Sequence, residues 1–230
     1  MKKISLIISF VVLFAVGGMA QIGDFRIGLK VGPSFDWASP GSAQTTNDGM
    51  GIGLVSGLVV DYYFTENVAV SSGLNLNLLR MKYTFTDRRW IGEVLEETDL
   101  LVSRRLKATN LEIPIKIKMK FDVTDSFGAY VEAGGGLSIN VKDFGKDSYS
   151  YYWISSEGES YEDCTNQYRP LQASMIFGLG AEYELNKNLS AFAQLTFDHS
   201  FSNALVSSLA KQTGSIIRNN FIGVEVGILY

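Results

Sequence analysis

The chain has 230 residues, a formal net charge of -4 and one cysteine, Cys164. The length suits one domain or one complete barrel. The weak negative charge lacks the basic stripe that nucleic-acid binding needs, so we expect no nucleic-acid partner. A composition with 23 glycines, 14 phenylalanines and 11 tyrosines but 4 prolines is typical of β-rich proteins. Cys164 has no second cysteine to pair with, and we interpret it as an incidental loop residue.

The first twenty residues have the pattern of a secretory signal peptide. Two lysines precede the apolar run "ISLIISFVVLFAV", and small residues precede a cleavage site at Gln21. The alternative is a membrane anchor, for which the run is short. The sequence therefore predicts a signal peptide over 1–20, followed by one exported domain over 21–230.

Eight β-strands are predicted in that domain, each with apolar and polar residues in alternation. In chain order they cover 25–37, 51–64, 67–86, 105–121, 127–141, 171–185, 189–201 and 216–230. Three connections are short polar turns, at 65–67, 122–126 and 186–188. The other four are long, at 38–50, 87–104, 142–170 and 202–215. Long and short connections alternate strictly, which is typical of an up-and-down outer-membrane barrel with short periplasmic turns and long outer loops.

The segment "LEIPIKIKMKF", 111–121, shows the alternation most clearly. Its apolar side chains share one face, and Glu112, Lys116, Lys118 and Lys120 share the other. Alternation by itself does not say which face is inside, because a soluble lipocalin-like barrel would bury the apolar face. The membrane arrangement is favoured because glycines lie on the polar face, as a narrow interior requires, and because aromatic residues gather near strand ends as interfacial girdles. The predicted girdle residues are Tyr62, Phe64, Phe121, Phe127, Tyr183 and Tyr230 at the turn end, and Trp37, Tyr83 and Phe85 at the loop end.

With the polar face inside, charges of both signs meet in the lumen. Unpaired charge in a closed interior is costly, so we expect a lumen plugged by salt bridges and hydrogen bonds. The predicted members of this network are Arg26, Lys30, Asp61, Glu112, Lys116, Lys118, Lys120, Glu132, Glu182, Glu184, Asp198 and Glu225. Pro114 cannot donate to a β-ladder, so a bulge or local break is expected there. The predicted fold class is all-β: an eight-stranded antiparallel up-and-down transmembrane β-barrel with a polar, plugged lumen, in the outer membrane.

Four segments also resemble a known family. "LEIPIKIKMKF", "FGAYVEAGGGLSI", "GLGAEYEL" and the terminal "FIGVEVGILY" are similar to the PorT-like outer-membrane β-barrel proteins of the Bacteroidetes type. The resemblance covers about residues 21–230, and the "EIP" strand start and the Gly-rich sixth strand are its most specific parts. It implies an eight-stranded outer-membrane barrel without catalytic residues. Some relatives are linked to protein secretion across the outer membrane.

Chemistry at the barrel rim is the first alternative function. His199 is the only histidine and follows Asp198, but neighbouring strand residues point to opposite faces, so the two side chains should not meet. One histidine would also serve too many candidate serines for a recognisable triad. We therefore predict no enzyme activity, no catalytic residues, no cofactor and no metal site. A narrow channel is the second alternative, although eight strands enclose an interior that side chains fill.

The outer loops are the candidate binding surface. Tyrosine and tryptophan make adaptable contacts, and the possible contact residues are Trp90, Tyr149, Tyr151, Tyr152 and Trp153. Arginines flank the second loop, and Arg88, Arg89, Arg104 and Arg105 are predicted to lie within reach of lipid phosphates. The alternative is a solvated cap that only shields the barrel. The predicted function is that of a non-enzymatic envelope protein with a structural or partner-binding role, of which a secretion accessory is one form. Its expected partners are outer-membrane lipid and other envelope or secretion proteins.

Overall fold

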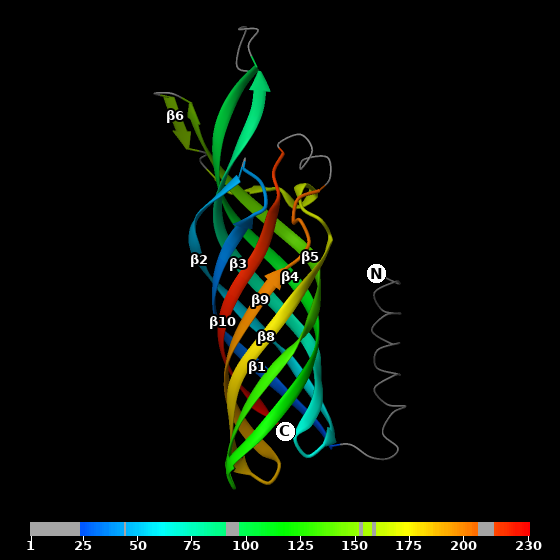
Figure 1. Ribbon diagram of the computed structural model, residues 1–230. Helices are drawn as coiled ribbons and strands as arrows, with labels where there is room; N and C mark the ends of the chain where they lie inside the picture. The colour runs from blue at the N-terminus through cyan, green and yellow to red at the C-terminus, as the bar shows by residue number, and fades with distance from the viewer. Residues whose placement is uncertain (1–23, 44, 91–96, 152–153, 158–159, 207–213) are drawn as a thin grey trace, which may run out of the picture.

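A computed structural model describes residues 24–43, 45–90, 97–151, 154–157, 160–206 and 214–230. The chain forms a tall β-barrel (Figure 1). The strands of its wall are β1 (Asp24–Pro40), β2 (Thr45–Thr65), β3 (Val68–Trp90), β4 (Glu97–Thr124), β5 (Phe127–Tyr151), β8 (Leu171–Asn186), β9 (Leu189–Ser200) and β10 (Ile217–Leu229). Within the described part of the chain, no helix is long and apolar enough to cross a membrane. The expected signal peptide over 1–20 lies outside the described residues.

The eight wall strands close into a ring of antiparallel neighbours. The hydrogen-bonded order runs β4, β3, β2, β1, β10, β9, β8, β5, and a β4–β5 ladder closes it. Hydrogen-bonded partners followed once around the ring from Arg26 on β1 lead back to β1 at Asp36, ten residues further along the strand. Such an offset requires strands tilted by about 35–45° to the barrel axis. The predicted eight-stranded meander is therefore confirmed.

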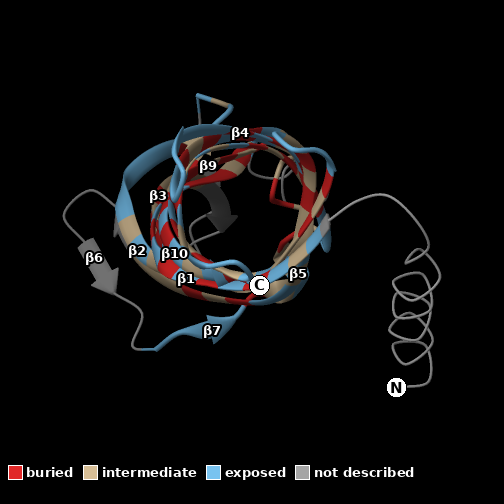
Figure 2. Cartoon of the chain, turned by 90° about the horizontal axis from the view of Figure 1, so that it is seen from below, coloured by how far each residue is buried: buried red, intermediate tan, exposed pale blue. Residues whose placement is uncertain are grey.

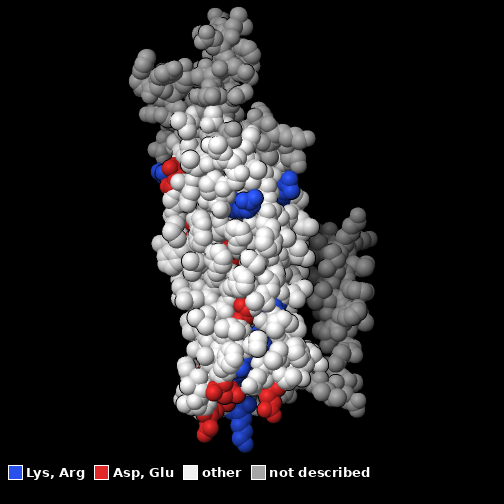
Figure 3. All heavy atoms as spheres, viewed as in Figure 1, with Lys and Arg blue, Asp and Glu red and all other residues white. Residues whose placement is uncertain are grey.

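The outer face of the wall is apolar around the ring. Ile27 on β1, Ile115 on β4 and Leu179 on β8 keep 57%, 60% and 58% of their surface exposed. Buried residues alternate with more exposed ones along the wall strands (Figure 2), and an almost uncharged band crosses the face of the barrel that Figure 3 shows. Soluble monomers rarely expose apolar patches beyond a few hundred Å². This apolar band therefore faces lipid, and the soluble alternative is wrong.

Above the apolar band, the two faces of the wall exchange character. On β3 the outward residues change from Leu78 to Arg80 and Lys82, while the buried inward residues change from Asn77 to Leu79. On β4 the same exchange occurs beyond Leu111, without any change in the period-two phase. We call the part of β3, β4 and β5 above this boundary (79–90, 97–109 and 142–151) the extension. Its inside is built like the core of a soluble protein.

This exchange explains why two predicted loops are largely strand. The predicted loop at 38–50 shrinks to a connection at 41–44, and the loop at 87–104 becomes a hairpin of β3 and β4. Apolar inward side chains let these strands continue pairing beyond the membrane. For the same reason, the prediction that Tyr83 and Phe85 belong to an interfacial girdle is wrong. Both side chains point inward, with 1% and 6% exposure. At the turn end, the predicted girdle residues Phe64, Phe121, Phe127, Tyr183 and Tyr230 are exposed.

Residues 160–170 fold over the mouth of the barrel, and we call them the mouth cap. They include β7 (Glu162–Asp163), which pairs with β5, and the short helix η1 (Thr165–Gln167). A further strand, β6 (Ile154–Glu157), pairs with β5 beside the wall. The mouth cap closes a buried cluster that includes Leu79, Met81, Tyr83, Phe85, Val102, Leu106, Cys164, Tyr168, Leu205, Ile217 and Phe221.

Pro114 interrupts the ladder as expected, but it forms no bulge. The β3–β4 pairs run to Ser72 with Ile115 and resume at Asn75 with Glu112 in unchanged register. The Ser72 hydroxyl donates to the Pro114 carbonyl at 2.8 Å across the gap. On the other side, Pro114 stays in register with Gly136 of β5. Of the two expected irregularities, the local break is therefore confirmed and the bulge is not found.

Candidate functional site: the charged lumen and its capped mouth

The lower lumen holds a cation between two carboxylates. Lys118 on β4 reaches Asp61 on β2 at 2.7 Å and Glu182 on β8 at 3.4 Å. Arg26 on β1 binds the same Glu182 at 2.5 Å, and the Lys118 ammonium also lies 4.3 Å from the ring centre of Tyr130. These side chains come from strands on different sides of the ring. They therefore tie the walls together across the lumen.

Two further ion pairs lie beside this group. Lys116 binds Glu132 of the neighbouring β5 at 2.5 Å, and Lys30 binds Glu225 of the neighbouring β10 at 2.7 Å. A neutral chain joins them to the rest, in which Tyr130 donates to Gln194 at 2.7 Å and Gln194 donates to Glu225 at 2.8 Å. At the turn end, Lys120 reaches the half-exposed Glu184 at 3.1 Å. Charges of both signs thus fill the lower lumen.

The upper lumen has acids held by neutral donors. Glu112 accepts hydrogen bonds from Asn75 at 2.9 Å, Asn77 at 3.0 Å and Ser138 at 3.3 Å. Asp198 accepts one from Ser174 at 2.9 Å. All residues of the predicted network face inward. Asn75 and Asn77 are not among the residues that the sequence predicts for this network, although both lie on the inner face and donate to Glu112.

Glycines give the lumen network its room. A Cβ atom on Gly178 would lie 2.3 Å from the Glu132 side chain, and one on Gly180 would lie 2.3 Å from the Tyr130 ring. Both glycines are on β8, in register with these two residues of β5. Larger residues there would displace the side chains that cross the lumen. The expectation that glycines share the crowded polar face therefore has a direct steric cause.

The structure separates Asp198 from His199. Asp198 is buried in the lumen, whereas His199 lies on the outer face between Phe197 and Phe201, with ring centres 6.3 and 6.1 Å away. The two side chains therefore form no catalytic pair. Among the described residues, no group of three or more His, Cys, Asp and Glu side chains is arranged to hold a metal ion.

At the mouth, Arg104 is the central polar residue. Its guanidinium donates two hydrogen bonds of 2.6 Å to the Asp147 carboxylate and one of 2.6 Å to Gln167 of the mouth cap. Next to it, the hydroxyls of Tyr83 and Tyr168 are hydrogen-bonded, and burial raises the pKa of Tyr83 to about 12. The prediction that Arg104 faces lipid is wrong, because even-numbered residues of β4 point inward; its neighbour Arg105 points outward. Arg104 thus fastens the mouth cap to the barrel.

The predicted loop contacts fall at the edge of what the structure describes. Tyr152 and Trp153 lie outside the described residues, as do the side chains of Trp90, Tyr149 and Tyr151, whose backbones belong to β3 and β5. The side chains of the predicted lipid contacts Arg88 and Arg89 also lie outside them.

Cys164 lies in the loop between β7 and η1, as the sequence predicts, but its side chain is buried. It is 4% exposed in the mouth cap, and burial raises the pKa of its thiol to about 11. Because the thiolate is the reactive form, we expect alkylation at pH 8 to be slow in the folded protein and fast after unfolding. Mass spectrometry after timed exposure to iodoacetamide measures both rates. Equal rates in the two states would contradict a closed mouth cap.

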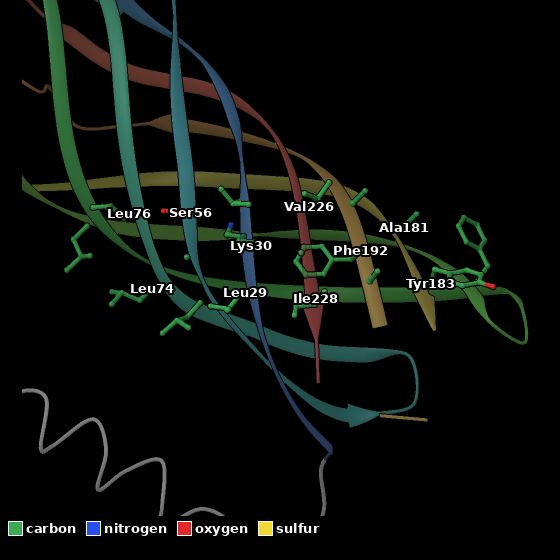
Figure 4. Close-up of a pocket in the computed structure, with 18 residues that line it drawn as sticks. Leu29, Lys30, Ser56, Leu74, Leu76, Ala181, Tyr183, Phe192, Val226 and Ile228 are labelled. Atoms are coloured by element: carbon green, nitrogen blue, oxygen red, sulfur yellow. The ribbon is translucent and has the colours of Figure 1, made fainter. Parts of the chain in front are cut away.

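One hollow lies on the outer face of the described part of the wall. An apolar furrow of about 1030 Å³ follows the hydrogen-bond direction around the barrel, from Phe127 on β5 to Leu111 on β4. Figure 4 shows side chains that line the furrow from neighbouring strands. In the strand register, Leu29 of β1 pairs with Ile228 of β10 on one side and with Leu58 of β2 on the other. The furrow belongs to the apolar band, so acyl chains would fill it.

Comparison with known proteins agrees with this architecture. Residues 19–209 match the family described as "Outer membrane protein beta-barrel domain", and the chain belongs to this family. The protease OmpT of Escherichia coli is 9% identical, with a TM-score of 0.53 over 92% of this chain and 99% of that one, which shows the fold alone. Neisserial surface protein A is 10% identical with a TM-score of 0.43, over 90% of this chain and 98% of that one. Ail of Yersinia pestis is 12% identical with a TM-score of 0.34, over 91% and 100%. No curated protein matches the sequence significantly.

Proposed function

We propose that this outer-membrane barrel is a non-enzymatic envelope protein that binds partner proteins through its extension. The observation that carries the proposal is the extension itself, whose strands continue above the apolar band around their own buried core. A surface held rigid before binding loses less conformational entropy when a partner docks. The extension also presents Leu101 outward, 54% exposed, on a part of the wall that lies beyond the apolar band.

Site-specific photocrosslinking tests this proposal in intact cells. Thr86 and Leu101 are cross-strand partners on the outward face of the extension, and Leu76 and Leu111 are a matched pair in the apolar band. With a photoreactive residue at Thr86 or Leu101, we expect the same protein adduct from both positions. The matched pair should yield lipid adducts instead. Extension positions that capture no protein would contradict the proposal.

We also propose that the barrel does not conduct. The ion pairs of Lys118, Lys116 and Lys30 cross or fill the lower lumen, and the mouth cap covers the opposite end. Planar-bilayer recordings of the refolded protein should therefore stay at the baseline over a wide voltage range. Discrete current steps that disappear when the protein is omitted would establish the channel alternative.

Two further proposals concern the kind of partner and the export of the chain. We propose that the partners belong to machinery that moves proteins across the outer membrane, on the basis of the resemblance to PorT-like barrels. We further propose export through cleavage of residues 1–20, which N-terminal sequencing of the mature protein would check. Secretion proteins among the photocrosslinked adducts would support the accessory role. If the adducts contain only other envelope proteins, the secretion-accessory role is contradicted and a structural role is supported instead.

A further inference from the structure

Six cationic residues lie together on the outward face of the wall, immediately above the apolar band. On each of three neighbouring strands, the outward apolar residues end and basic residues follow: after Leu78 on β3, Leu111 on β4 and Val141 on β5. We call this set the basic patch, and its members are Arg80, Lys82, Arg105, Lys107, Lys142 and Lys146. Arg80, Arg105 and Lys142 are exposed, and the other three are half-buried.

The strand register sets these like charges side by side. Arg80 is the direct cross-strand partner of Lys107, and Arg105 lies between its partners Lys82 and Lys146. Directly opposed side chains on one face of a sheet are close neighbours, and like charges in these positions destabilise the pair. An arrangement of this kind is stabilised when anions bridge the cations.

The protein supplies part of the counter-charge. Asp48 on β2 reaches Lys82 at 3.4 Å, and β7 brings Glu162 and Asp163 to the edge of β5. Lys107 also lies 3.7 Å from the ring centre of Tyr161. Arg105 and Lys146 have further interactions of their own. In the part of the chain that the structure describes, no carboxylate forms an ion pair with the remaining members Arg80, Lys107 and Lys142. On the opposite side of the ring, at the corresponding height, Arg218 of β10 occupies the outward face next to Ser39 of β1.

The height of the basic patch indicates the anion. Lipid-facing apolar side chains end directly below it, so its charges lie at the level of the lipid headgroups. Arginine binds phosphate oxygens in bidentate fashion, and lysine reaches them from a flexible apolar stem. We propose that the basic patch binds the phosphate groups of a phosphorylated lipid in the outer leaflet. This inference rests on the outer-membrane location and is independent of the protein partners proposed for the extension.

Native mass spectrometry in detergent tests the proposal, with lipid A as the probe and its dephosphorylated form as the chemical control. R80Q/K107Q removes one opposed pair of the basic patch, and R218Q/K187Q removes two cations elsewhere as the charge-matched control. We expect the wild type and R218Q/K187Q to retain lipid A, and R80Q/K107Q to bind it about tenfold more weakly, as expected for loss of a charge-assisted contact. None of the three proteins should bind the dephosphorylated lipid tightly.

Three outcomes would overturn the proposal. They are equal retention of the dephosphorylated lipid, undiminished retention of lipid A by R80Q/K107Q, and full displacement of lipid A by an equal concentration of inorganic phosphate. The last outcome would identify a site for the free anion. Heat-modifiable migration on a denaturing gel shows that each variant is a folded barrel. Absence of this migration in the wild type would contradict the membrane assignment. A folded wild-type barrel that does not retain lipid A would contradict only the lipid-binding proposal.

Discussion

Replacing Lys118 with methionine should lower the free energy of unfolding of the barrel by about 3–5 kcal/mol, the usual effect of removing one partner of a buried ion pair. Lys118 is 3% exposed and lies between Asp61 and Glu182, neither of which is more than 1% exposed. Methionine keeps the length of the side chain but leaves two carboxylates facing each other without the ammonium. Arg26 still binds Glu182, so Asp61 carries most of the penalty.

Urea unfolding of the refolded protein in lipid vesicles, followed by tryptophan fluorescence, measures this loss. Lys120→Met is the matched control, because Lys120 lies two residues away on the same face of β4 and binds the more exposed Asp122 and Glu184. Its substitution should cost less than about 1 kcal/mol. Adding Asp61→Asn to Lys118→Met should restore part of the stability. Equal losses for Lys118→Met and Lys120→Met would show that water, and not Lys118, neutralises the lower lumen.

Replacing Arg104 with methionine should open the mouth cap while the membrane-spanning barrel stays folded. The change leaves Asp147 without its bidentate partner and Gln167 without its donor. A loss of about 3 kcal/mol from this buried pair would raise the population of the open mouth cap on the order of 100-fold. Cys164 lies in the buried cluster beneath the mouth cap, together with Tyr168. Its thiol reacts only when it is exposed, so its reaction rate reports the opening of the mouth cap.

The rate of Cys164 alkylation at pH 8 is therefore the measurement, with heat-modifiable migration as the check on the barrel. Arg105→Met is the control, because Arg105 precedes Leu106 on the same strand but points outward. It should leave the alkylation rate within a fewfold of the wild type. An unchanged rate in Arg104→Met would mean that apolar packing of Tyr168 and Leu205 alone holds the mouth cap. Loss of the whole barrel would mean that the extension and the membrane part fold as one cooperative unit.

Strand number and the two faces of the membrane part could be predicted because both rest on local alternation, and strand order because short and long connections alternate along the chain. The residues of 111–121 show this, since a period of two places Lys116, Lys118 and Glu112 together whatever surrounds them. The same rule placed Asp198 and His199 on opposite faces. The rule could not be applied to Arg104, because the sequence predicts a loop over 87–104 whereas β4 starts at Glu97. The prediction that Arg104 reaches lipid phosphates is wrong for this reason.

Pairing partners across the lumen could not be predicted. Lys118 meets Asp61 and Glu182 because the ring closes with an offset of ten residues, so strands far apart in sequence contribute side chains at one height. Nothing in the segments around these three residues encodes that offset. The same holds for Tyr83 and Tyr168, which meet only because the mouth cap folds back over the barrel.

The sequence by itself thus determined that this chain forms an eight-stranded barrel with a polar inside and an apolar outside, because side-chain direction in a strand depends only on neighbouring positions. The tertiary structure alone decided where the membrane part ends, which charges pair and what covers the mouth. Those features depend on strand tilt, ring closure and the return of residues 160–170, which bring together residues that are distant in the chain. The basic patch depends on both, because alternation points its residues outward and the register of β3, β4 and β5 sets them side by side.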